Sequence, residues 1–469
     1  MAPIEARARE LPRNYWIAGL LGAYACVIAA SPSPLAAIAW SAPLVAIPLV
    51  LWILQSASRW LWCFFFAALL LPPLPFAFGD SGPHVAVILA GLGLICGTLR
   101  LSEWRLKRDL LAFAMAVFFL VLLASSALAV FYSGLHVAAG SLARVLLFGI
   151  PLYVFFYTAY GPRHWFSVRR LYWFGLLSAL FACVDFYYQF PAPAGYGPQF
   201  IWLDSGIYRR AQGFFYEAST LGNVCAFFLI MIAVTLLRGR RQRLVSRLAL
   251  WFGAPVLFAA LVLSYSRASL LNLFVALAAL LYMERARIRI GRLLAIAASC
   301  LAAGSLAAWQ FFPEVAWGYW MRLVHSQFFF TQPGSVLSGR VASWQAIAAF
   351  LAAHPWHAIL GIGYKTLPYS DFIGRSIVAD NMYLSLLVET GIVGLAAFLL
   401  LNVAILRTAW RAARRDDSRA SFFGTWIFCF WIGQLFQMLS GDLFTYWRVL
   451  PLYFWVLAMA ARRLRQVPQ

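Results

Sequence analysis

Charged residues are scarce in this chain: they make up 11% of its 469 residues, whereas 63% are hydrophobic. A soluble protein cannot cover so much apolar surface, and apolar runs of about 17–25 residues, the length that crosses a bilayer, recur along the chain. These runs lack the alternating polarity of membrane β-barrel strands. Helices are expected because lipid offers no partner to a free backbone amide. The composition therefore predicts an all-α, polytopic transmembrane helical bundle.

Several chemical signals are also missing. All seven cysteines fall within the apolar runs, so no disulfide framework is expected. The six histidines show no metal-ligand spacing, because His354 and His357 stand three residues apart with Pro355 between them and no Cys or carboxylate nearby. No P-loop, nucleotide fingerprint or G-x-S-x-G motif is present. We therefore expect no metal, no cofactor and no ATP-dependent chemistry.

The apolar runs predict fourteen spans, and twelve remain possible if two errors compensate. We expect N-terminal transmembrane helices over 1–312 with about eleven spans, a large outside loop over 313–380, and about three spans over 381–469. The fourteen predicted spans lie near 15–30, 36–54, 61–78, 84–99, 110–131, 143–160, 171–189, 213–237, 248–264, 268–283, 293–312, 381–406, 420–439 and 446–461.

The net charge of +21 is interpreted mostly as a topology signal. With the N-terminus inside, most of the 37 Lys and Arg residues fall in cytoplasmic loops, as the positive-inside rule demands, and both termini are cytoplasmic. Nucleic-acid binding is disfavoured because the basic loops are short and lie beside membrane helices. Nine basic residues are left outside: Arg144, Arg209, Arg210, Arg267, Arg322, Arg340, Lys365, Arg375 and Arg448.

Three of these outside arginines are candidates for binding an anion. Arg210 precedes a span, Arg267 lies in the short turn SYSRAS, and Arg340 lies in LSGRVASW, at the start of a predicted amphipathic helix around 339–353. A guanidinium near the outer surface suits phosphate or carboxylate. The alternative is that each arginine reaches lipid headgroups or pairs with an outside acid such as Asp204, Glu217 or Asp442.

Glu217 lies in RRAQGFFYEASTLGN, near the start of a predicted span. If the helix begins early, Arg210, Gly213 and Glu217 share one face at spacing i, i+3, i+7. A glutamate just inside the outer boundary is a functional candidate, although a simple Arg210–Glu217 ion pair is an equal alternative.

In the stretch SIVADNMYLSLLVETGIVGL, residues 376–395, Asp380 and Asn381 lie at the start of another predicted span. Asp380 is either a proton acceptor or an ordinary N-cap, since Asp is among the best caps. Glu389 is expected on the opposite face of the same helix, in a structural role, with Gly391 and Gly394 permitting close helix packing.

These motifs, taken in order, resemble the O-antigen ligase and polysaccharide polymerase superfamily. The residues that carry the resemblance are RRAQGFFYEAS, SYSRAS, G339-R340-x3-W344-x-A346, LGIGY at 360–364, the acid-Asn pair at 380–381, and ETGIVG at 389–394. The similarity covers roughly residues 205–395. It departs at Asp380-Asn381, where ligases of this superfamily usually carry His-Asn.

The resemblance implies a metal-independent glycosyltransferase of GT-C-like helical architecture in the bacterial inner membrane. It implies a polyprenyl-diphosphate-linked glycan as donor at the periplasmic face, and a glycan or lipid A-core as acceptor. Asp380 would be the base, Asn381 would orient the acceptor or the carboxylate, and Glu217 is the next candidate. Arg210, Arg267 and Arg340 would bind the diphosphate.

Three functions stay open. The departure at Asp380 and the Phe-Tyr-Glu-Ala-Ser segment favour a polymerase over an O-antigen ligase. A transporter or flippase would also have many spans, but it should carry charges near the middle of several of them. Here the polar residues cluster toward the outer face.

Overall fold

The computed structural model describes residues 15, 18–74, 83–162, 166–192, 197, 199–203, 206–238, 244–285, 309–310, 313–326, 340–369 and 377–464. Its helices and strands, in chain order, are α2 (Pro34–Leu54), α3 (Arg59–Leu70), α4 (Val85–Thr98), η1 (Leu101–Glu103), α5 (Leu110–Tyr160), α6 (Val168–Tyr188), β1 (Phe200–Leu203), β2 (Gly206–Arg209), α7 (Ala218–Arg238), α8 (Arg247–Leu263), α9 (Arg267–Glu284), α11 (Pro313–Ser326), α13 (Arg340–Ala353), α14 (Pro355–Leu360), α15 (Met382–Ala413), α16 (Ser418–Gln437), η5 (Leu443–Tyr446) and α17 (Leu450–Leu464).

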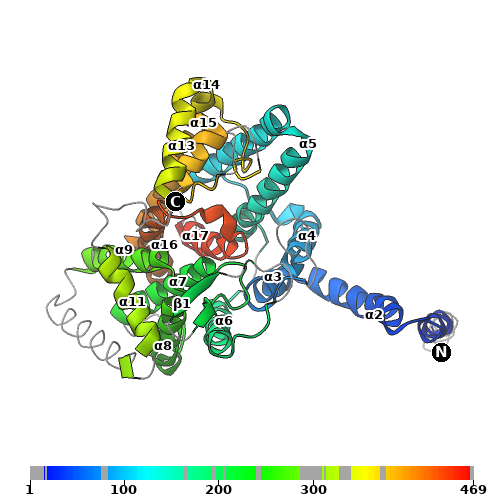
Figure 1. The fold of residues 1–469 in the computed structure, drawn as a ribbon. Coiled ribbons are helices and arrows are strands. Elements are labelled where there is room, and N and C mark those ends of the chain that lie inside the picture. The colour runs from blue at the N-terminus through cyan, green and yellow to red at the C-terminus, as the bar shows by residue number, and fades with distance from the viewer. Residues whose placement is uncertain are drawn as a thin grey trace.

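The predicted all-α bundle is confirmed (Figure 1). Within the described residues, five helices are long and apolar enough to cross a membrane, namely α5, α6, α7, α9 and α15, and several shorter apolar helices accompany them. The predicted span at 293–312 lies outside the described residues, apart from 309–310. The predicted boundaries of the large loop, at residues 312 and 380, remain a prediction.

Helix α5 contains two of the predicted spans. Its 51 residues would measure about 77 Å if straight. However, the backbone N–H of Arg105, just before the helix, donates to the carbonyl of Tyr160 at its end (2.9 Å). The chain must therefore fold back, and it does so at Gly134, whose φ of 83° is available to glycine at little cost. Two antiparallel halves result, as predicted for 110–131 and 143–160.

Helix α17 lies in the centre of the bundle (red in Figure 1) and packs against α5, α15 and α16. Large side chains such as Tyr453 and Trp455 are fully buried there. Because α17 is enclosed by protein, it positions the short η5 segment and the α16–α17 connection above it.

Strands β1 and β2 form a small antiparallel hairpin. Strands β1 and β2 pair with Phe200 opposite Arg209 and Leu203 opposite Gly206. Helix α7 begins only at Ala218, so the expected helical face through Arg210, Gly213 and Glu217 is wrong. Gly213 instead has φ 57° and packs tightly against α6, where an added Cβ would lie 3.0 Å from that of Ala182.

The predicted helix around 339–353 is confirmed as α13, and α14 follows it and packs against α15. The N–H of Ile362 donates to the carbonyl of Val388 (3.1 Å), and that of Gly363 to the carbonyl of Glu389 (2.9 Å). These two bonds satisfy carbonyls released where α15 kinks at Gly391, at φ 69°. The LGIGY and ETGIVG motifs are therefore in direct contact through their backbones.

Candidate functional site

A cavity of about 1300 Å³ opens at one end of the bundle. The segments around it come from the second half of α5, the start of α7, the α8–α9 turn, α11, the start of α13, residues 364–369, the start of α15 and the α16–α17 connection. The predicted topology puts all of these on the outer side. Helix termini and irregular segments thus meet where polar side chains can be exposed.

All six site residues predicted from the sequence line this cavity. They are Arg210, Glu217, Arg267, Arg340, Asp380 and Asn381. They come from four separate segments, which no local sequence pattern brings together.

Asp380 and Arg340 form an ion pair just before the N-terminus of α15. Nε of Arg340 lies 3.1 Å from Oδ2 of Asp380, and the side chains are 27% and 45% exposed. The backbone of Asp380 has φ 45°, a strained region for a residue with a side chain. The indole of Trp344 donates to the carbonyl of Ala379 (2.7 Å) and so holds this segment against α13.

Asn381, and not Asp380, is the N-cap of α15. Its Oδ1 accepts hydrogen bonds from the backbone N–H groups of Tyr383 (3.0 Å) and Leu384 (3.1 Å). This removes the capping explanation for Asp380. It also means that the amide oxygen of Asn381 is occupied by the backbone N–H groups of α15.

Arg210 directly follows β2, Arg267 lies at the turn between α8 and α9, and both line the cavity. Nε of Arg210 donates to the carbonyl of Ser264 (2.7 Å), which ties the two segments together. Ser266 caps α9 through a bond from the N–H of Ser269. Arg267 is the first residue of that helix and is exposed.

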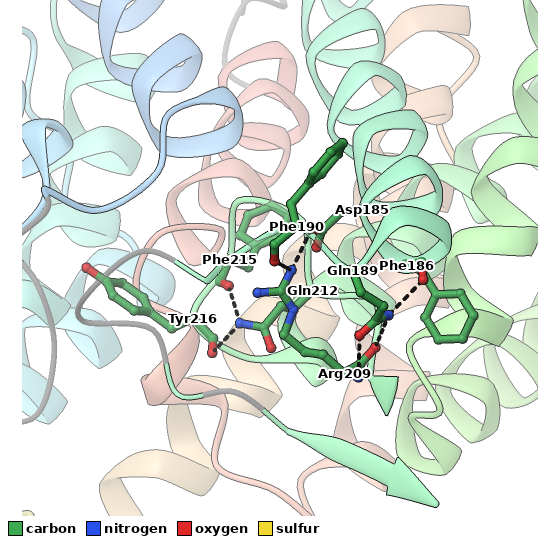
Figure 2. Close-up of polar contacts among 8 residues, drawn as sticks. All are labelled: Asp185, Phe186, Gln189, Phe190, Arg209, Gln212, Phe215 and Tyr216. Atoms are coloured by element: carbon green, nitrogen blue, oxygen red, sulfur yellow. Dashed lines mark hydrogen bonds and ion pairs between the residues drawn. The ribbon is translucent and has the colours of Figure 1, made fainter. Parts of the chain in front are cut away.

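Arg209, the neighbour of Arg210, is not among the residues that line the cavity and contacts Asp185, Phe190 and Gln189 instead (Figure 2). Its Nη2 lies 2.5 Å from Oδ1 of Asp185 and 2.8 Å from the carbonyl of Phe190. The two charged side chains are only 8% and 5% exposed. Gln189 adds a bond to each backbone polar group of Arg209. This arginine therefore has a buried structural partner.

Glu217 lies on the loop just before α7 and is the more enclosed of the two candidate carboxylates. The hydroxyl of Ser219 donates to its Oε2 (2.9 Å). Burial raises the pKa of Glu217, and the carboxylates of Asp442 and Asp380 add to that rise, whereas Ser219 and Lys365 oppose it. A carboxyl group shifted in this direction is a stronger proton acceptor.

Sequence reasoning missed Lys365 and Asp442 as a pair. Nζ of Lys365 contacts Oδ2 of Asp442, and both line the cavity. Burial lowers the pKa of Lys365, but Asp442 and Glu389 more than offset it, so its pKa lies above the usual value. One signal was available: Lys365 is one of only two lysines in the chain, and it directly follows LGIGY.

Glu389 also lines the cavity, which corrects the expectation that it faces away from Asp380. Its carboxylate accepts bonds from the backbone N–H of Leu367 (3.3 Å) and the hydroxyl of Ser385 (3.2 Å). The helix-face argument failed because residues 377–381 are not helical, so the count of turns from Asp380 did not apply.

Comparison with protein families identifies the central part of the chain. Residues 252–399 match the O-antigen ligase family. The match covers about a third of the chain, including the α8–α9 turn, Arg340 and the start of α15. No curated protein matches the chain. The resemblance to the O-antigen ligase and polymerase superfamily is confirmed. The apolar helices and this match together indicate a membrane protein, and the match supports its being an enzyme similar to the glycosyltransferase-like ligases and polymerases.

The arrangement of these side chains suits transfer chemistry. Arginines from three segments can bind an anion, and two carboxylates beside them can accept a proton. Among the residues that the structure describes, no group of three or more His, Cys, Asp or Glu side chains is placed to hold a metal ion.

Proposed function

We propose that this protein transfers a glycan from a polyprenyl diphosphate to a sugar hydroxyl, at the periplasmic face of the bacterial inner membrane, and that it polymerises repeat units. The observation that carries the proposal is one cavity in which Arg210, Arg267 and Arg340 meet Glu217 and Asp380. Such a cavity at one end of a helical bundle suits a reaction at one membrane surface.

In the proposed reaction, the acceptor hydroxyl attacks the anomeric carbon of the donor glycan. The bond between that carbon and the diphosphate oxygen breaks, and the polyprenyl diphosphate leaves with the bonding electrons. The hydroxyl proton passes to a carboxylate, which is Asp380 or Glu217. The arginines offset the charge that develops on the leaving diphosphate.

The same chemistry serves a ligase, and one observation favours that alternative: the family matched over residues 252–399 is described as O-antigen ligase. The two activities differ in their acceptor. A polymerase extends another lipid-linked repeat unit, whereas a ligase uses lipid A-core.

The test is transfer by the purified protein in nanodiscs, with a polyprenyl-diphosphate-linked repeat unit as the donor. A ladder of lengthening glycans from this donor alone supports a polymerase. A single added glycan that requires lipid A-core supports the ligase. The absence of both products, with the donor unchanged, would overturn the proposal.

Substitution of each carboxylate tests the proton acceptor. Asp380→Asn and Glu217→Gln preserve shape and remove the ability to accept a proton. The acceptor should lose on the order of 10²–10⁴ in turnover while binding of a short polyprenyl diphosphate is retained. Asp380→His should keep part of the activity if Asp380 is that residue, because the superfamily usually carries His there.

A further inference from the structure

A continuous polar network lies beneath Glu217, where α7, α9 and α16 pack together. Nδ2 of Asn223 donates to Oε1 of both Gln434 and Gln437 (2.6 Å each), and Nδ2 of Asn272 donates to the same two oxygens (3.1 and 2.8 Å). All four amide side chains are at most 1% exposed. Polar groups so deeply buried are costly unless they are paired.

The network reaches Glu217 through Ser219. Gln437 donates to the hydroxyl of Ser269 (3.3 Å), and Ser269 donates to the backbone carbonyl of Ser219 (3.3 Å). The hydroxyl of Tyr446 is in hydrogen-bonding contact with the side chains of Ser219 and Gln437, and this tyrosine is 4% exposed. Ser219 is therefore held from its backbone and from its side chain.

The direction of these bonds follows from proton counting. A serine hydroxyl carries one proton, and that of Ser219 is donated to Oε2 of Glu217. In that state the Tyr446 hydroxyl can only donate to Ser219. The two hydroxyls then point along one line toward the carboxylate, and each bond strengthens the next.

We propose that Ser219 and Tyr446 are positioning residues that keep Glu217 ionised and oriented, which makes Glu217 the proton acceptor of the transfer. The inference rests on the proposed function. Asp380 then serves mainly to orient Arg340, with which it is paired at 3.1 Å.

Other charged and titratable groups line the same cavity as Glu217. Asp442, Asp380 and Lys365 affect the titration of Glu217, and every one of these groups except Tyr446 is the same in the wild type and the variants. They are Arg144, Arg210, Tyr216, Tyr265, Arg267, Glu314, Arg340, Tyr364, Lys365, Tyr369, Asp380, Glu389, Asp442 and Tyr446.

The competing explanation is that the network only binds helices together, as buried amides do in membrane proteins. The two explanations differ in pH dependence. A hydrogen bond to the ionised carboxylate lowers its pKa, so its removal should raise the pKa of Glu217. Loss of packing alone should lower activity equally at every pH.

The experiment measures kcat/KM for glycan transfer against pH for Ser219→Ala and Tyr446→Phe. Glu217 must be ionised to accept a proton, so the acidic limb of the profile should move to higher pH. We expect a shift of about one to two pH units for Ser219→Ala and a smaller one for Tyr446→Phe. Activity should recover at alkaline pH, and Ser219→Thr, which keeps the hydroxyl, should restore the wild-type profile.

Matched controls remove buried hydroxyls elsewhere. Ser126 donates to the carbonyl of Leu123 within α5, and Tyr172 donates to the carbonyl of Ala249. Ser126→Ala and Tyr172→Phe should leave the acidic limb in place.

A second readout does not depend on transfer. Infrared spectroscopy of the purified protein follows the carboxyl C=O band of Glu217, which is assigned by its absence in Glu217→Gln. Ser219→Ala should raise the pH at which this band reaches half of its full intensity, which is the midpoint of the titration. An unchanged midpoint, or activity lost equally at all pH values, would overturn the inference. Wild-type transfer by Glu217→Gln would also overturn it, and would leave the proposed function intact with Asp380 as acceptor.

Discussion

Arg209 and Arg210 are adjacent in the chain and lie in different surroundings. Arg209 is enclosed by Asp185 and the Phe190 carbonyl, whereas Arg210 reaches a cavity that it shares with arginines from two other segments. A buried guanidinium needs a partner that satisfies it permanently. A guanidinium beside a large cavity can exchange its contacts for those of a ligand. Of two adjacent arginines, one is thus paired with a buried carboxylate and the other lines a cavity.

The largest effect should come from the cavity arginines. We expect Arg210→Ala, Arg267→Ala and Arg340→Ala each to lower turnover on the order of 10²–10³-fold, with thermal unfolding in detergent nearly unchanged, because each removes a cation from the leaving diphosphate. Lysine at these positions should restore only part of the activity, since it lacks the bidentate fork. Full activity in all three alanine variants would contradict the arginine role.

Arg209→Ala should lower the stability of the fold instead of acting mainly on turnover. It leaves Asp185 buried without its cation, which costs about 3–5 kcal/mol of folding stability. The measurement is the unfolding midpoint of the purified protein next to that of Arg210→Ala. The double variant Asp185→Leu/Arg209→Met should recover much of the loss, because no buried charge remains. If Arg209→Ala unfolds like the wild type, the contrast between the two arginines fails.

Two glycines extend the comparison to the backbone. Gly391 has φ 69°, and an added Cβ would lie 2.0 Å from the carbonyl oxygen of Ile359. Gly391→Ala should therefore destabilise the protein by roughly 1–3 kcal/mol and lower activity. Gly140, within α5, has nothing within 4 Å of that position. Gly140→Ala should be neutral or stabilise the protein by about 0.5–1 kcal/mol. Equal effects of the two substitutions would rule out the close contact between α14 and α15.

The smallest expected effect is that of chelation. If arginines alone offset the charge of the diphosphate, EDTA should leave the transfer rate unchanged. Activity that EDTA abolishes and Mg²⁺ or Mn²⁺ restores would assign part of that task to a metal. Assays of the wild type and of Arg267→Ala, with and without EDTA, separate the two sources of positive charge.

The sequence alone determined the helical class, several of the apolar helices and the identity of six residues that line the cavity. Hydrophobic length is a local property, and so is the order of motifs from RRAQGFFYEAS to ETGIVG. For that reason the two halves of α5 and helix α13 were predicted close to where they lie.

Partnership between distant residues was decided by the tertiary structure. The sequence did not separate Arg209 from Arg210, because their difference depends on Asp185, which lies 24 positions away in another helix. It did not pair Lys365 with Asp442, nor connect Ser219 to Tyr446. It did not decide between Asp380 and Asn381 as the N-cap of α15, which in the structure is Asn381, while Asp380 has a left-handed φ of 45°. Such outcomes depend on how helices pack and where they kink, and a local pattern of residues determines neither.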